Sequence, residues 1–569
     1  MTARSLSERA CALAARLYPW TVTPSDELRR ALAFLDSGPD AESVVRAGYG
    51  LGLLTSALGL VGTALFGFGA VGATVSVALG LLTTHLVHET PAYLALARRT
   101  RALGRAPDLV ARAVLRMRLA PSPERAAAFA AETGTGPLTD SLARYVERAE
   151  AVGGGPLAAF GAEWAEWYPE LERAFGLVAA ASSMDRLDRD RTLDRALDGV
   201  LDGTRTRMRE FAASVGRPVT ALYAFGVLLP TALVALLPAA GAAGVGVTTA
   251  TVVVVYDLAL PVAVVTAGVW LVVRRPVAFP PPDVDRTHPE VPDRRWTAAG
   301  PGILAAGSGW VVARRMLPEW AGPVAALGLG VGCSLWLYYR PVVAVYDHVR
   351  EVESGLTDAL SLVGRRVANG VAVETALAAA AADLDGAMGT VLDRAVTRQR
   401  QLNVGVRDAF LGPHGALADV PSPRVRGSVT LLGLAAREGS PVGPALLALS
   451  DHAGELRRVE RESRQDLAKV CGTLRNTGSL FGPMVAGATV AMADGIATGP
   501  ALAGGGETLP GLGPAVAGYA LAFAVALPAL ATSLSRGFDG PLVGYQVGRS
   551  LCLATPVYLG SYLIVAGIA

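Results

Sequence analysis

Nine stretches of this 569-residue sequence are apolar and nearly free of charge over lengths close to a bilayer crossing, and they constrain its fold more than any other feature. A helix of roughly 20 apolar residues crosses a hydrocarbon core of about 30 Å. The hydrophobic content of 51% and the 65 glycines are too high for an ordinary soluble enzyme. We therefore expect an all-α polytopic membrane protein with about nine transmembrane helices. The runs are Val44 to Phe68, Val71 to Val87, Pro218 to Pro238, Val245 to Val273, Thr297 to Ala313, Gly322 to Tyr339, Gly478 to Thr498, Pro514 to Leu534 and Leu551 to Ile568.

Two polar blocks, residues 88–216 and 340–475, interrupt the apolar runs. Leu, Ala and Val recur in them at three- and four-residue spacing, which predicts amphipathic helices that pack on one another. A constant offset of 250 residues aligns Arg366, Glu374 and Gly386 with Arg116, Glu124 and Gly136 without a gap. This register indicates an internal duplication. The alternative is that two Ala-rich amphipathic helices resemble each other by composition alone.

These features divide the chain into six parts. They are an N-terminal tail (1–43), a transmembrane hairpin (44–87), a first helical domain (88–216), four transmembrane helices with a Pro/Arg linker at 274–296 (217–339), a second helical domain (340–475) and three transmembrane helices (476–569).

The distribution of arginine predicts the orientation. If both polar blocks are cytoplasmic, the Arg-rich linker at 274–296 is cytoplasmic too, and the loops at 239–244 and 499–513, which then face outward, contain no Lys or Arg. This asymmetry is the positive-inside signature, so we expect a multi-pass protein of the cell membrane. Arg314 and Arg315 are the exception, because this topology places them on the outer side.

No motif in the sequence indicates catalysis or a cofactor. The only lysine, Lys469, follows no Gly-rich loop, which excludes a Walker-type ATPase. The six histidines and four cysteines form no recognisable metal or disulfide pattern. The net charge of +2 gives no reason to expect a nucleic acid partner.

Asp257 is the one acid in the middle of an apolar run. Ionisable groups at this depth are costly and usually have a role. One interpretation is a substrate or proton site, beside the helix-kinking Pro261. We favour the other interpretation, a polar contact between helices, because no basic partner is evident in the other runs.

The second polar block resembles a known family. The segment from Ala436 to Leu446, AREGSPVGPAL, is similar to the Gly-Glu-containing turn of the type II secretion system F domain, and the segment from Arg366 to Leu377 resembles the Glu-x-Ala-Leu helix of that domain. The first block looks like a diverged copy. The nine spans and Ala- and Arg-rich usage are similar to the long archaeal form of this family, the platform proteins of type IV pilus, archaellum and Tad-like machines.

This resemblance implies a non-catalytic platform that docks a separate hexameric secretion ATPase and guides pilin-like subunits into a filament. The residues it implies for docking are Arg365, Arg366, Glu374, Arg437 and Glu438, with Arg116 and Glu124 as their first-domain equivalents. The motif departs from the family in the order Arg437-Glu438-Gly439, where Gly-Glu is usual. Contacts with lipid and a homodimer are also expected. Two alternatives remain. One is a secondary transporter that uses Asp257, and the other is a membrane scaffold or receptor.

Overall fold

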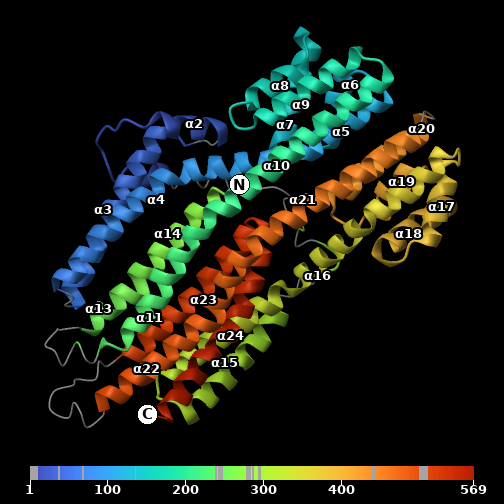
Figure 1. Ribbon diagram of the computed structural model, residues 1–569. Helices are drawn as coiled ribbons and strands as arrows, with labels where there is room; N and C mark the ends of the chain where they lie inside the picture. The colour runs from blue at the N-terminus through green and yellow to red at the C-terminus, as the bar shows by residue number, and fades with distance from the viewer. Residues whose placement is uncertain are drawn as a thin grey trace.

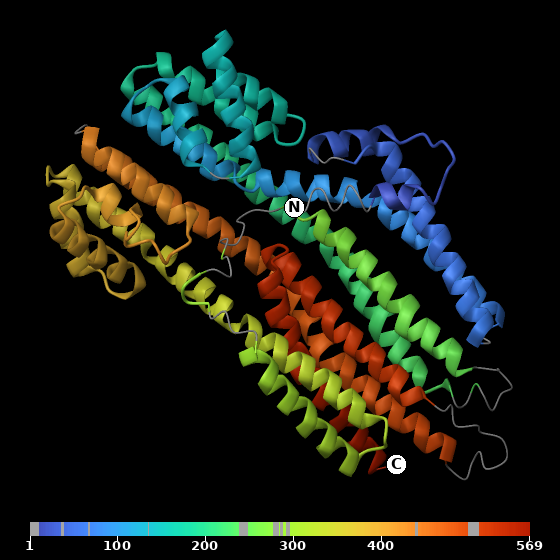
Figure 2. The same ribbon diagram turned by 180° about the vertical axis from the view of Figure 1, so that it is seen from behind.

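The fold comes from a computed structural model, which describes residues 11–35, 39–66, 69–134, 136–237, 240, 248–276, 284, 288–291, 296–438, 442–498 and 511–568. Every regular element in these ranges is a helix. The helices form an apolar bundle, two helical domains at one end of it, and a separate hairpin beside it (Figures 1 and 2). The predicted all-α class is therefore confirmed.

The hairpin pairs α3 (Ala41–Phe66) with α4 (Gly69–Leu103), and α2 (Asp26–Leu35) packs against it. Small residues bring the two long helices together: a Cβ added to Gly52 would lie 2.0 Å from the Thr84 hydroxyl. Arg46 Nε donates to the Tyr18 carbonyl at 2.9 Å. Part of the predicted N-terminal tail is thus ordered against the hairpin.

The first helical domain contains α5 (Ala106–Leu119), α6 (Pro123–Thr133), α7 (Pro137–Val152), α8 (Pro156–Trp164), α9 (Pro169–Ala180) and the start of α10 (Arg186–Tyr223). Helices α6 to α9 each begin with proline, whose fixed φ suits the first helical turn, where its missing N–H is not needed. Trp164 and Tyr168 are almost completely buried in the core. The Tyr168 hydroxyl donates to the Val200 carbonyl at 2.7 Å, which fastens the loop before α9 to α10.

The second helical domain contains the last part of α16 (Ala321–Ala368), α17 (Val373–Asp383), α18 (Gly386–Leu402), α19 (Val406–Leu411), α20 (Pro423–Glu438) and the start of α21 (Val442–Asn476). Its core is aliphatic, with Val349, Leu360, Leu377 and Leu392 among the buried side chains. Leu115 of α5 belongs to the same cluster, and Phe129 of α6 packs against it. The two domains are therefore in direct apolar contact.

The apolar bundle contains, in chain order, η2 (Ala224–Leu228), α11 (Leu229–Val234), α13 (Thr249–Val253), η3 (Val254–Ala259), α14 (Leu260–Val273), α15 (Trp296–Met316), the first half of α16, η4 (Thr477–Phe481), α22 (Gly482–Thr498), α23 (Leu512–Arg536) and α24 (Gly540–Ala566). The three η elements are π-helical turns. Glycines allow α16 and α24 to approach closely: a Cβ on Gly548 would lie 2.4 Å from the Trp336 backbone nitrogen. Small residues of this kind are typical of helix contacts in membranes.

Seven helices in the described residues are long and apolar enough to cross a membrane. The predicted count of about nine is not confirmed. The other two predicted spans, residues 71–87 and 297–313, lie in α4 and α15, which are helical but are not among the seven. The seven are Ala41–Ala64, Arg186–Val234, Thr251–Val273, Ala321–Ala368, Gly443–Ile496, Leu512–Arg536 and Gly540–Ala566.

Three of these helices continue from the apolar bundle into the helical domains. They are Arg186–Val234, Ala321–Ala368 and Gly443–Ile496, of 49, 48 and 54 residues. The predicted boundaries at 216/217 and 339/340 fall inside the first two of them, and the boundary at 475/476 falls inside the third. Both helical domains lie at the same end of the bundle, whereas α11, α13 and α22 lie towards the opposite end (Figure 1).

Candidate functional site at the junction of the two helical domains

The residues predicted to dock a partner gather in part at the outer tip of the second domain. Arg365 and Arg366 lie in the last turn of α16, and Glu374 lies in the first turn of α17. Arg365 and Glu374 are exposed, whereas the Arg366 side chain is 31% exposed and pairs with Asp383. The tip therefore presents both charge signs to solvent.

The start of α21, which follows α20 in the chain, approaches the same tip through glycine. A Cβ added to Gly443 at the start of α21 would lie 2.4 Å from the Ala368 backbone nitrogen at the end of α16. Arg437 and Glu438 form the last two positions of α20, but their side chains, like residues 439–441, lie outside the described part of the chain. The structure thus brings this segment to the tip without describing those two side chains.

The predicted equivalents in the first domain are placed separately. Arg116 is half-buried in the last turn of α5, next to Leu115, which packs on the second domain. Glu124 is exposed in the first turn of α6, where its carboxylate accepts a hydrogen bond from the Ser122 hydroxyl at 2.9 Å. Ser122 also caps α6, so Glu124 contributes to a local cap as well as to the surface.

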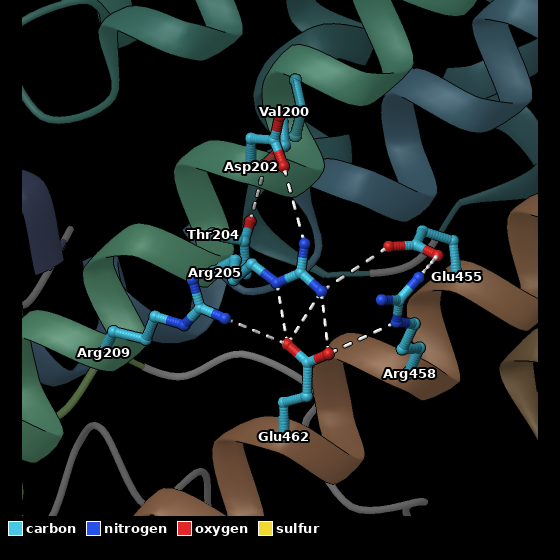
Figure 3. Close-up of polar contacts among 8 residues, drawn as sticks. All are labelled: Val200, Asp202, Thr204, Arg205, Arg209, Glu455, Arg458 and Glu462. Atoms are coloured by element: carbon cyan, nitrogen blue, oxygen red, sulfur yellow. Dashed lines mark hydrogen bonds and ion pairs between the residues drawn. The ribbon is translucent and has the colours of Figure 1, made fainter.

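A cluster of charges that the sequence did not predict joins the two domains. Arg205 of α10 donates two hydrogen bonds to the Glu462 carboxylate of α21, at 2.8 and 2.9 Å (Figure 3). Arg209 lies 3.4 Å and Arg458 lies 3.3 Å from the same carboxylate, and Glu455 lies 3.9 Å from Arg205. We call this group of five residues the interdomain clamp.

The geometry of the clamp fixes how the Arg205 and Glu462 side chains face each other. A planar guanidinium that binds both oxygens of one carboxylate fixes the orientation of both side chains. The Arg205 side chain is 20% exposed and the Glu462 side chain is 29% exposed, so water screens the pair only in part. Towards the bundle from the clamp, Met208 and Phe211 of α10 share an apolar cluster with Leu467 and Cys471 of α21. The clamp therefore holds the two long helices together where they leave the helical domains.

A second charged cluster fixes the second domain internally. The buried guanidinium of Arg424 donates to Glu460 at 3.0 Å and lies 3.7 Å from Glu353. Burial alone would lower the pKa of Arg424, but Glu460, Asp108 and Glu353 together raise it above its ordinary value, so the group stays charged. Asp108 belongs to α5, which extends this electrostatic contact to the first domain.

Comparison with known proteins identifies no relative. No family model, no curated protein and no solved structure matches the chain.

Asp257 lies in the π-helical turn η3, inside the apolar bundle. Its Oδ1 faces α23, because a Cβ added to Gly518 would lie 2.8 Å away. This oxygen is buried and has no hydrogen-bond partner among the described residues. The polar contact between helices is made by the neighbouring Tyr256, whose hydroxyl donates to the Pro230 carbonyl at 2.9 Å.

Sequence reasoning missed both members of the central pair. Glu455, Arg458 and Glu462 follow a helical spacing of three and four on α21, which indicates a charged helix face. That spacing does not identify Arg205 as the partner, because the contact spans 257 positions of the chain.

Proposed function

We propose that this chain is an integral membrane platform of a type IV pilus-like or type II secretion-like machine. Its two helical domains would face the cytoplasm and dock a hexameric secretion ATPase. Its membrane bundle would guide pilin-like subunits into a filament. The chain itself would be non-catalytic, and its surroundings would be the lipid of the cell membrane, in which it could also pair as a homodimer.

The observation that carries this proposal is the continuity of the long helices. Three helices of 48 to 54 residues run without a break from the helical domains into the apolar bundle. A displacement imposed on the domains would therefore reach the bundle as the movement of rigid elements rather than being absorbed in linkers. This is the property that a platform driven by an external motor needs.

The matching helix bounds support the proposed duplication. Helices α6 and α17 both have 11 residues and begin at Pro123 and Val373, 250 positions apart. Helices α7 and α18 end at Val152 and Leu402, again 250 apart. Gly136, which precedes α7, and Gly386, the first residue of α18, have φ values of +97° and +84°. Composition alone does not explain equal helix lengths and left-handed glycines at one offset.

The same offset supports nine membrane spans. The hairpin of α3 and α4 precedes the first helical domain, and α15 with the start of α16 forms a second hairpin before the second domain. Helix α3 ends at Phe66, and α15, which begins at Trp296, ends at Met316. The two helix ends are therefore 250 positions apart. Arg314 and Arg315 are exposed at the end of α15, on the outer side in this topology.

The docking proposal predicts that charge reversal at the tip strongly reduces partner capture. The full chain in detergent would be used as bait in the cytoplasmic fraction of its host, with mass spectrometry of the retained proteins. We expect a secretion-type ATPase to be retained, and Arg365→Glu to reduce its recovery by about tenfold, because Arg365 is exposed and its change leaves the core intact.

The matched control is Arg191→Glu, which changes another exposed arginine, on α10 of the first domain. This variant is expected to retain the ATPase like the unmodified chain. If Arg365→Glu and the unmodified chain retain equal amounts of the ATPase, the tip is not the docking surface. If the unmodified chain retains no such ATPase, this result contradicts the proposed platform function.

A secondary transporter is the second candidate, because one carboxylate oxygen of Asp257, inside the apolar bundle, has no partner among the described residues. If the chain is a platform, Asp257→Asn should leave filament assembly unchanged. The amide also removes the cost of a charge at that depth, so we expect an equal or higher apparent unfolding temperature. Solute uptake by proteoliposomes that is lost on Asp257→Asn would instead support the transporter.

A further inference from the structure

A cavity of about 90 Å³ lies where the two helical domains meet the end of the apolar bundle. Its lining comes from α5, α7 and α10 of the first domain, from α16, α20 and α21 of the second, from Arg275 just after α14, and from the end of α23. A volume of this size holds several water molecules, or one small tetrahedral anion.

The lining of the cavity is strongly basic. It contains seven arginines and three acids, a formal excess of four positive charges. Two of the acids already have partners: Glu353 accepts a hydrogen bond from Ser422 at 2.6 Å, and Glu460 pairs with both Arg424 and Arg464. The three acids cannot neutralise all of the arginines. The arginines are Arg105, Arg112, Arg275, Arg350, Arg424, Arg464 and Arg536.

Arg275 is the most informative of these arginines because it is only 3% exposed. Its Nε and Nη2 donate to the Leu534 and Ser535 carbonyls at 2.6 and 3.2 Å, which fixes the guanidinium against the end of α23. Its Nη1 is buried and has no partner among the described residues. A buried cationic donor without an acceptor is costly, and an anion in the adjoining cavity would satisfy it.

Arg536 provides a second cation at the same place. It is the last residue of α23 and lines the cavity with Arg275. Neither residue has an acid within ion-pair distance in the part of the chain that the structure describes. Burial lowers the pKa of Arg275 to about 10, so this group is still protonated at neutral pH.

The depth of the two arginines indicates where the anion comes from. Arg275 follows the apolar helix α14 by two residues, and Arg536 ends the apolar helix α23, which packs beside α14. Both cations therefore lie at the polar edge of the apolar bundle, the level of lipid headgroups in a membrane.

We propose that this cavity binds a phosphate group through Arg275 and Arg536, and that an anionic phospholipid headgroup supplies it. Guanidinium groups bind phosphate oxygens in paired hydrogen bonds, which suits a site built mainly from arginine. Because both helical domains line the cavity, the bound phosphate would tie them to each other and to the membrane surface. This site is independent of the proposed platform function.

The test uses the full chain, purified in neutral detergent and depleted of lipid. Phosphatidylglycerol is expected to raise the apparent unfolding temperature, and phosphatidylcholine, which has no net charge, is not. Arg536→Gln should weaken phosphatidylglycerol binding by at least about tenfold, since it removes a charge-assisted contact. The Arg536 side chain makes no hydrogen bond within the described residues, so this variant should fold. Arg275→Gln should have the larger effect on binding.

The control variant is Arg314→Gln with Arg315→Gln, two exposed arginines at the other end of the bundle. Its lipid response should equal that of the unmodified chain. If inorganic phosphate stabilises the chain, with the same dependence on Arg536, while phosphatidylglycerol does not, the phosphate site stands and its source is soluble. The proposal is overturned if folded Arg536→Gln binds phosphatidylglycerol and phosphate as the unmodified chain does, or if neither compound affects the unmodified chain.

Discussion

Substituting Gly443 with alanine is expected to push the start of α21 away from the end of α16 and to destabilise the second helical domain. The added Cβ would lie 2.4 Å from both the backbone nitrogen and the Cα of Ala368. Backbone atoms cannot rotate away as a side chain can, so the two helices themselves must separate. Overpacking of this kind costs about 1 to 3 kcal/mol, and a backbone clash lies at the upper end of that range.

The measurement is the apparent unfolding temperature of the purified chain in detergent, together with proteolysis near the tip. Gly472→Ala is the control on the same helix, because a Cβ there meets no atom within 4 Å. Alanine stabilises a helix interior relative to glycine by about 1 kcal/mol, so the control should be neutral or slightly more stable. If Gly443→Ala were as stable as Gly472→Ala, the close contact between α16 and α21 would not exist as described.

Reversing the charge of Glu462 is expected to open the interdomain clamp. Glu462→Arg would place a fourth guanidinium beside Arg205, Arg209 and Arg458, which replaces two good hydrogen bonds by repulsion. Amide hydrogen exchange should increase by about tenfold or more in the facing segments of α10 and α21, because local opening there becomes more frequent. If the chain is a platform, Glu462→Arg should also reduce filament assembly.

Two further variants test whether the pairing itself is responsible. Glu462→Gln keeps the shape but not the charge, so its effect should be smaller. The exchanged pair Arg205→Glu with Glu462→Arg should recover part of the protection, since Arg209 and Arg458 still face the new arginine. Asp188→Arg, on an exposed pair of α10, is the control and should change nothing. Equal exchange in Glu462→Arg and in this control would show that the clamp does not hold the domains.

Much of this architecture could be predicted from local sequence. Uncharged runs such as Pro514 to Leu534 and the polar blocks between such runs predict the helices and their division into bundle and domains, because both signals lie within a single helix. Trp164 and Tyr168 are both buried, as aromatic residues at that spacing usually are.

The contacts between elements could not be predicted in the same way. Arg205 and Glu462 are distant in the chain and each lies in a run of mixed charges that reads as a solvated face. Arg275 looked like a marker of topology in the linker, whereas it is buried against two carbonyls of α23. A polar contact between helices was expected at Asp257; the structure shows one at the neighbouring Tyr256, which the sequence did not indicate. Partner choice depends on how helices pack, and single-sequence periodicity does not carry that information.

The unbroken course of α16 has a mechanical consequence. The Tyr346 hydroxyl donates to the Asp539 carboxylate at 2.8 Å, which pins the middle of the helix to the turn between α23 and α24. From Tyr346 to Ala368 the helix extends about 33 Å, at about 1.5 Å per residue. A swing of about 5° about this fulcrum would therefore move the outer tip by about 3 Å. The part of the helix on the other side of the pin, which is of similar length, would swing the opposite way, like the second arm of a lever.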